Sequence, residues 1–146
     1  MDAINRLLIE SECTQLCVRF ARHLDNGDFE AMFALFTPDG VFDRVGQILR
    51  GPEQMRAAFG SRPTGIRSRH VVTNIDFLDV SAREAEARIY NLSFHAVGDE
   101  GAGPLTYATE NPRFIDFHDH YRLTDEGWRF ASRTSGVVFV PRDWQE

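Results

Sequence analysis

Residues 69–97 read RHVVTNIDFLDVSAREAEARIYNLSFHAV, and this stretch decides the fold. Apolar, mostly β-branched or aromatic side chains alternate with polar ones on both sides of the short polar segment 81–83. Alternation with a period of two, interrupted by a turn, is typical of two antiparallel strands that each bury one face. We therefore predict strands at residues 69–80 and 84–97, both much longer than an average strand.

The segment before this stretch has helical periodicity. Apolar residues recur every three or four positions from Ile4 to Leu24, which predicts a helix that Asp2 caps and Gly27 ends. Shorter elements are expected after it: a helix at 29–36, a turn at 37–40, strands at 41–45 and 47–49 that pivot on Gly46, and a helix at 52–59 that Pro52 opens.

Two more long strands are predicted at residues 113–124 and 128–140. A glycine-rich connection leads into the first of them through a short or irregular segment at 105–109. Helices followed by a run of antiparallel strands indicate an α+β domain. We expect one domain over residues 1–146, in which a strongly curved sheet wraps the N-terminal helices and leaves a conical pocket open at one end.

The composition excludes several classes of function. With 22 acidic and 16 basic side chains the formal net charge is −6, which argues against nucleic acid or an anionic membrane as the main partner. No apolar run approaches the roughly 20 residues of a membrane-spanning helix, and the first residues lack the layout of a signal peptide. We therefore expect a cytoplasmic protein.

The cysteines and the phenylalanines are candidates for either core or site residues. Cys13 and Cys17 are the only cysteines, and their spacing suits a helical core face better than a disulfide or a metal site. The 12 phenylalanines fill a core or line a cavity for a flat apolar ligand. The expected walls of such a cavity are Phe20, Phe42, Met55, Phe59 and Phe117.

The two predicted long strands of residues 69–97 each carry a histidine among other polar side chains. Alternation places His70, Val72 and Asn74 on one face of the first strand. On the second strand, His95 shares its face with Asn91 and Ser93.

Asp25, at the end of the first helix, lies within reach of these histidines if both faces point into the cone. Its carboxylate would then fix the tautomer of His70 and stabilise the protonated ring, making His70 a general base near neutral pH. The alternatives are that Asp25 only caps a loop and that His70 is an ordinary hydrogen-bonded core residue.

A second polar group, Asp116, His118 and His120, alternates along one face of the predicted strand 113–124. All three side-chain types bind metal ions. Positions on one strand face lie about 7 Å apart, however, so a single ion would not readily take all three. We expect a solvated or interface face here, and no metal site.

Several short motifs, in order, carry a family resemblance that covers nearly the whole chain. They are LDNGDF at 24–29, LFTPDG at 35–40, GPE at 51–53, RHVVTN at 69–74 and DEGWRF at 125–130. With these motifs the chain resembles the polyketide-cyclase-like (SnoaL-like) branch of the nuclear transport factor two-like superfamily. The resemblance implies a conical pocket and homodimers, or higher homo-oligomers, formed through the outer face of the sheet.

Within that superfamily the chain is most similar to the scytalone dehydratase and hexachlorocyclohexane dehydrochlorinase type. This resemblance implies a cofactor-independent reaction in which an aspartate–histidine pair removes a proton and water or chloride is eliminated. Asp25 and His70 match that pair, and His95 matches a second histidine of the dehydratase.

The sequence also differs from the dehydratase at positions that contact the substrate. Leu24 and Arg44 stand where the dehydratase has tyrosines that polarise the substrate carbonyl, and Ile115 lies near the position of its pocket serine. Scytalone itself is therefore not the expected substrate, and Arg44 is expected to stabilise an enolate, to bind an acidic group or to form a surface ion pair.

Two functions follow from these observations. The first is a lyase or isomerase that acts on a small, mostly apolar, cyclic or aromatic molecule, with Leu24, Arg44, Asn91 and Ser93 among its substrate contacts. The alternative is a ligand-binding or assembly module of the same fold that performs no chemistry.

Overall fold

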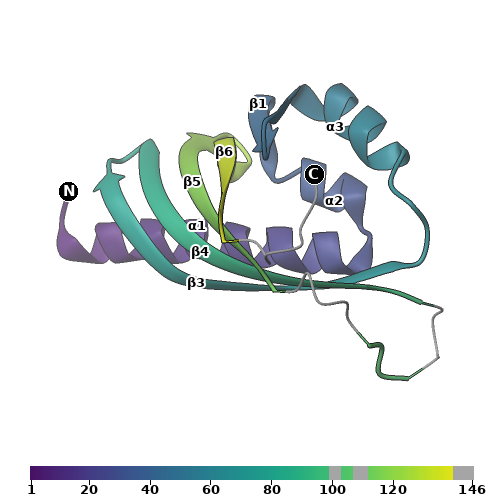
Figure 1. Cartoon of the computed structure of the whole chain (residues 1–146). Helices are drawn as coiled ribbons and strands as arrows, with labels where there is room; N and C mark the ends of the chain where they lie inside the picture. Colours follow the sequence, from purple (N-terminus) through teal and green to yellow (C-terminus); the bar gives the residue numbers. More distant parts are fainter. Residues whose placement is uncertain (99–102, 107–111, 140–146) are drawn as a thin grey trace.

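A computed structural model of the chain describes residues 1–98, 103–106 and 112–139 (Figure 1). Its helices are α1 (Ala3–Asn26), α2 (Phe29–Phe33) and α3 (Gly51–Gly60), and its strands are β1 (Phe36–Arg44), β2 (Gln47–Arg50), β3 (Ile66–Val80), β4 (Glu84–Val97), β5 (Arg113–Thr124) and β6 (Gly127–Phe139). The predicted bounds of β4 and β5 are confirmed, whereas residues 107–109 and Val140 lie outside the described residues. No helix in the described part of the chain is long and apolar enough to cross a membrane.

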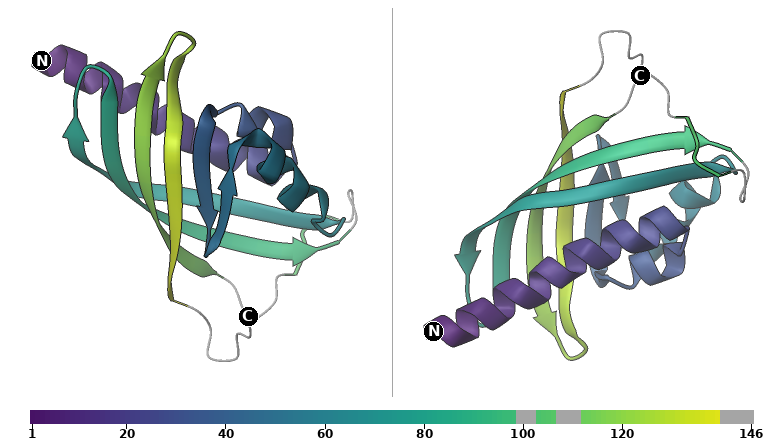
Figure 2. Two further views of the ribbon diagram at one scale, coloured as in Figure 1. Left: turned by 90° about the horizontal axis from the view of Figure 1, so that it is seen from above. Right: turned by 90° about the horizontal axis from the view of Figure 1, so that it is seen from below.

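All six strands form one curved sheet in the order β2-β1-β6-β5-β4-β3. Neighbouring strands are antiparallel except β1 and β6, which are parallel. The two views of Figure 2 show α1 crossing the strands on one side of the sheet, with α2 and α3 near its C-terminal end. The predicted α+β architecture, a curved sheet around N-terminal helices, is confirmed.

Both predicted ends of α1 are confirmed. The carboxylate of Asp2 accepts a hydrogen bond from the backbone N–H of Asn5 at 2.8 Å, as an N-cap should. At the other end Gly27 adopts a left-handed conformation, with φ of 76°, that residues with a side chain rarely tolerate. This cap ends the helix one residue after Asp25 and so sets the position of that carboxylate.

The apolar face of α1 is buried only from Cys13 onward. Ile4, Leu7 and Leu8 remain 58–71% exposed, because the first turns of α1 extend beyond the edge of the sheet (Figure 1). The periodicity of the sequence predicts the helix, but it does not show where the sheet beneath it ends.

The predicted turn at 37–40 is instead a bulge within β1. Phe36 pairs with Phe130 and Val41 with Ser132, so five residues of β1 advance against two of β6. A side chain on Gly40 would lie 2.8 Å from the carbonyl oxygen of Thr37, which explains the glycine. The motif therefore bends the strand, and the predicted helix 29–36 ends early, with Phe36 in the sheet.

A second bulge interrupts the alternation of β3. Asn74 has a positive φ of 50°, and the register with β4 shifts between Thr73 and Asp76. Ile75 and Phe77 then face the core, while Asn74 is exposed. The prediction that Asn74 shares the inner face with His70 is therefore wrong.

Phe20 lies at the centre of an aromatic core between α1 and the sheet. Its ring makes edge-to-face contacts with four other rings at centroid distances of 5.5–6.4 Å, those of Phe36, Phe42, Phe117 and Phe130. Cys13 and Cys17 are fully buried free thiols in the same core, which confirms their interpretation as core residues.

A buried ion pair links β5 and β6 within this core. Arg133 and Asp119 are both 0% exposed, and the guanidinium donates to the two carboxylate oxygens at 2.8 and 2.6 Å. The guanidinium carbon lies 4.2–4.4 Å from the ring centroids of Phe20, Phe117 and Phe130, and the Tyr121 hydroxyl donates to Asp119 at 2.8 Å. Sequence reasoning did not predict this network.

Candidate active site

A cavity of about 640 Å³ opens between the concave face of the sheet and the helices. This volume is within the range of small-molecule binding sites. Its lining comes from the C-terminal half of α1, the end of β1, the end of α3 and the loop that follows it, and the inner faces of β3, β4, β5 and β6.

Most residues expected at the site lie on this cavity. His70 and His95 line it, as do the expected contacts Phe20, Leu24, Phe42, Arg44, Phe59, Asn91, Ser93 and Phe117. Met55 does not line it, because its side chain is 0% exposed and belongs to the core beneath α3. Asp25 lines a neighbouring cleft instead, beside Arg62 and Ile66, so the carboxylate approaches His70 from outside the main cavity.

Asp25 and His70 form a short hydrogen-bonded pair. The Nδ1 atom of His70 lies 2.6 Å from Oδ1 of Asp25, and both side chains are 8% exposed. Two further donors hold the carboxylate: the Ser68 hydroxyl donates to Oδ1 at 2.8 Å, and the backbone N–H of His70 donates to Oδ2 at 2.9 Å. The end of α1 and the start of β3 are thus fixed to each other at the dyad.

The charge of Asp25 sets the tautomer of His70. Burial alone would raise the pKa of the Asp25 carboxyl, but the hydrogen bonds from His70 and Ser68 outweigh burial and lower it below its ordinary value. The carboxylate is therefore ionised at neutral pH and can only accept, so Nδ1–H of His70 donates to it. Nε2 remains the basic atom of a side chain that lines the cavity.

His95 stands edge-on to His70 within the same cavity. The two ring centroids are 5.6 Å apart and the ring planes are nearly perpendicular, at 89°. Burial, together with the positive charges of His70, Arg113 and Arg62, lowers the pKa of His95 to about 4. His95 is therefore neutral at pH 7 and offers one N–H donor and one lone pair.

The wall formed by β4 carries buried polar atoms without hydrogen-bond partners among the described residues. Asn91 and Ser93 are 0% exposed and line the cavity, yet neither side chain makes a hydrogen bond within the described residues. Buried polar atoms in folded proteins are almost always paired with protein, water or ligand. A water molecule or a ligand in the cavity can supply these partners.

Sequence reasoning missed two cavity residues, Arg62 and Arg113. Arg113 precedes Ile115 and Phe117 by two and four positions, so strand alternation alone would have placed it on the inner face. Arg62 lies in the loop between α3 and β3, and no periodicity marks it.

The second predicted group lies on the outer face of the sheet, away from the cavity. Nε2 of His118 lies 2.6 Å from a carboxylate oxygen of Glu86, and His120 is exposed beside them. The metal-capable atoms of Glu86, His118 and His120 lie within 4.8 Å of one another. Asp116, which the sequence placed in this group, does not belong to it. Because Nε2 of His118 is hydrogen-bonded to Glu86, we interpret the group as a polar cluster on the outer face of the sheet.

The buried thiols offer no alternative nucleophile. Burial raises the pKa of both Cys13 and Cys17 well above the ordinary value, so both are protonated thiols at neutral pH.

The comparison with known families agrees with this architecture. A model of the SnoaL-like domain matches residues 5–134, so the chain belongs to the SnoaL-like family. No curated protein sequence matches the chain. The resemblance found in the sequence motifs is thereby confirmed at the level of the family.

Three solved structures illustrate the shared fold. A candidate scytalone dehydratase from Novosphingobium aromaticivorans is 19% identical with a TM-score of 0.81, covering 99% of this chain and 93% of that one. A hexachlorocyclohexane dehydrochlorinase (LinA) type 2 is 14% identical with a TM-score of 0.77, covering 96% and 92%. An NTF2-like protein with a cystatin-like fold, also from N. aromaticivorans, is 23% identical with a TM-score of 0.72, covering 90% and 83%. Identities this low show the fold alone.

Proposed function

We propose that this chain is a cofactor-independent lyase or isomerase in which His70 takes a proton from a small cyclic or aromatic substrate. The observation that carries the proposal is the 2.6 Å contact between His70 Nδ1 and the Asp25 carboxylate, made by two buried side chains at the edge of an open cavity. A carboxylate behind a histidine orients the ring and fixes the tautomer, so that the opposite ring nitrogen can accept a proton.

The proposed proton transfer uses Nε2 of His70 as the base. It accepts a proton from a carbon next to an activating group, and Asp25 stabilises the imidazolium that forms. In an elimination, the C–H electron pair becomes the new double bond and the leaving group departs with the electron pair of its bond to carbon. A hydroxide leaving group takes up the proton that His70 now carries. In an isomerisation, the imidazolium returns the proton to a different carbon. Positioned general bases contribute about 10²–10⁴-fold, and exclusion of water by the apolar walls adds to this.

His95 is proposed to act as a neutral hydrogen-bond donor. Because its pKa is lowered to about 4, it is not a reservoir of acid protons at pH 7. A neutral imidazole N–H still polarises a carbonyl oxygen or holds a leaving group. The proposed role of His95 is therefore to hold the leaving group and not to protonate it.

A panel of small cyclic and aromatic carbonyl, hydroxy and halogenated compounds tests the function. Product formation by the wild-type protein is followed by mass spectrometry, and the same panel is given to His70→Ala and Asp25→Asn. We expect both variants to lose at least about a hundredfold in kcat, in line with loss of a positioned base. His120→Gln is the matched control, because this exposed histidine lies outside the cavity, and it should keep full activity.

The alternative, a ligand-binding module without chemistry, makes the opposite prediction. A packing role calls for a cavity filled by side chains, and the open volume of about 640 Å³ favours a ligand instead. If His70→Ala turns over a substrate of the wild-type protein at the full rate, the proposed dyad is wrong. Ligands that bind to the cavity without conversion by the wild-type protein would favour the module.

A further inference from the structure

We infer that the substrate is an anion, of the carboxylate type, which Arg44, Arg62 and Arg113 bind together at the cavity. The sequence predicted a mostly apolar substrate, and the three guanidinium groups change that expectation. The inference names the substrate class of the site and so rests on the proposed function, although anion binding can be measured without any turnover.

The three arginines come from separate elements and reach the same cavity. Arg44 ends β1 on the face that carries Phe42, Arg62 lies in the loop that follows α3, and Arg113 opens β5 opposite Ser93. Arg62 and Arg113 are half-buried, whereas Arg44 is exposed. Convergence from three parts of the chain is expected of a built site.

No acidic side chain of the described residues pairs with these three guanidinium groups. Arg44 and Arg62 lie over aromatic rings, 5.0 Å from the ring centroid of Phe59 and 5.6 Å from that of Phe29. Nε of Arg113 is buried and makes no hydrogen bond within the described part of the chain. Among the described residues, five other arginines pair with carboxylates: Arg6, Arg56, Arg122, Arg129 and Arg133.

The charges also act on one another across the cavity. Burial lowers the pKa of Arg44, and the charge of Arg113 lowers it further. Burial likewise lowers the pKa of Arg62, with an added contribution from Arg44, and the charge of Asp25 offsets part of this lowering. Like charges that are held together in a partly desolvated site repel one another, and a bound anion relieves that repulsion.

The chemistry of the cavity fits an aromatic or cyclic acid. A guanidinium group matches a carboxylate with two parallel hydrogen bonds, and such charge-assisted bonds are among the strongest in proteins. The rings of Phe20 and Phe117 form an apolar wall for the carbon skeleton, and Asn91 and Ser93 offer hydrogen bonds. This positive site belongs to a chain of formal net charge −6, so it concentrates anions locally against the charge of the whole protein.

Binding of 2-naphthoate and 2-naphthamide tests the inference, because the two probes share the ring system and differ in charge. Dissociation constants are measured at pH 7 by isothermal titration calorimetry. We expect the wild-type protein to bind naphthoate at least about tenfold more tightly than naphthamide, the effect of one charge-assisted hydrogen bond. Arg62→Gln and Arg113→Gln should each weaken naphthoate binding by about tenfold and leave naphthamide binding within about twofold.

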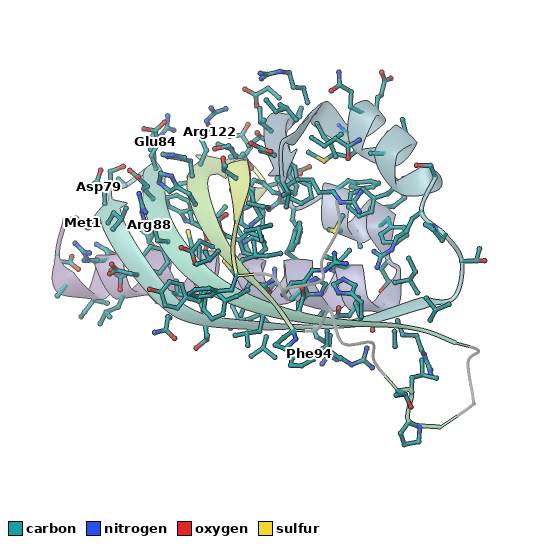
Figure 3. The ribbon with its side chains drawn as sticks, in the orientation of Figure 1. Met1, Asp79, Glu84, Arg88, Phe94 and Arg122 are labelled. Carbon is teal, nitrogen blue, oxygen red and sulfur yellow. The ribbon has the colours of Figure 1, made fainter. Side chains whose placement is uncertain are left out.

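Arg88→Gln is the matched control, because it removes one guanidinium charge from a residue that does not line the cavity. Figure 3 shows Arg88 with Glu84 and Arg122 at the end of the sheet far from α3, and Arg88 does not line the cavity. This variant should bind both probes like the wild-type protein. Unchanged naphthamide binding by the Arg62 and Arg113 variants also shows that they are folded.

Three results would overturn the inference: equal affinity for the two probes, no saturable naphthoate binding by the wild-type protein, or no selective loss in the Arg62 and Arg113 variants. Failure of the proposed function gives a different pattern. In that case either His70→Ala retains turnover or the wild-type protein converts no substrate, while naphthoate binding keeps its dependence on the arginines.

Discussion

At the scale of single residues, one carboxylate organises the site. Asp25 accepts from the Ser68 hydroxyl, from the backbone N–H of His70 and from the His70 ring. These donors fix the carboxylate, and the carboxylate in turn fixes the ring. A histidine that is held by its backbone and by its side chain loses little further conformational entropy when it adopts a reactive geometry.

The neighbouring His95 makes stability depend on pH. Its pKa falls from the ordinary 6.5 to about 4 on folding, so the unfolded chain binds a proton between these values that the folded protein does not. The contribution of His95 to the free energy of unfolding is therefore fully present above pH 6.5. It decreases as the pH drops from 6.5 towards 4 and does not change further at lower pH. The total loss is about 2–3 kcal/mol in the free energy of unfolding.

Urea denaturation between pH 4.5 and 7.5 measures this dependence. His95→Asn removes the titrating group and should flatten the profile over that range, whereas His120→Gln should keep the slope of the wild-type protein. Equal slopes for wild type and His95→Asn would show that His95 is not held neutral by its surroundings.

At the scale of secondary-structure elements, the buried pair on β5 and β6 connects the sheet to α1. Asp119 and Arg133 are register partners, and Sγ of Cys17 in α1 lies 3.3 Å from the Arg133 guanidinium. Burial would lower the pKa of Arg133, but the charge of Asp119 raises it, so the guanidinium stays charged. Phe20 and Phe117 separate this pair from the cavity, since both rings contact Arg133 and line the cavity.

Removing one partner of this pair should cost far more than removing both. Asp119→Leu and Arg133→Met each leave a buried charge without its counter-charge. Such a loss typically lowers the free energy of unfolding by about 3–5 kcal/mol. The double variant replaces the pair with apolar side chains and should be more stable than either single variant. Chemical denaturation of the four proteins measures the coupling, and strictly additive losses would contradict it.

Much of this element-level structure is predictable from the sequence. Hydrophobic periodicity and cap residues predict α1, the long strands and the place of Asp25, because these signals are local. The bulges at 37–40 and at Asn74 are not predictable in this way, since they depend on the register between strands. The same holds for Met55, whose burial depends on how α3 packs, and for the convergence of Arg62 with Arg113.

At the scale of the whole molecule, the outer face of the sheet carries a row of apolar side chains. Val71 pairs with Leu92, Leu92 with Phe114 and Phe114 with Phe139, so the row crosses β3, β4, β5 and β6. Val71 is 50% exposed and Phe139 65%. Tyr90 packs against Phe114 and is 43% exposed. An apolar row of this kind suits the homodimer that the family resemblance implies.

Light scattering after size-exclusion chromatography tests the homodimer. The wild-type protein should have twice the mass of one chain, and Tyr90→Lys should shift the population towards the monomer, because it places a charge beside the apolar row. Leu7→Lys, which changes an exposed apolar residue on α1, should leave the dimer intact. A wild-type monomer, or a dimer that Leu7→Lys disrupts and Tyr90→Lys does not, would contradict this arrangement.

Proton abstraction by His70 is the central claim, and solvent exchange measures it most directly. Cyclic and aromatic acids with a C–H bond next to a carbonyl group are incubated with the protein in D₂O. Deuterium incorporation into recovered substrate or product is then followed by mass spectrometry. We predict incorporation with the wild-type protein and with His120→Gln, and only the uncatalysed rate with His70→Ala and Asp25→Asn. Incorporation by His70→Ala at the wild-type rate would contradict the claim.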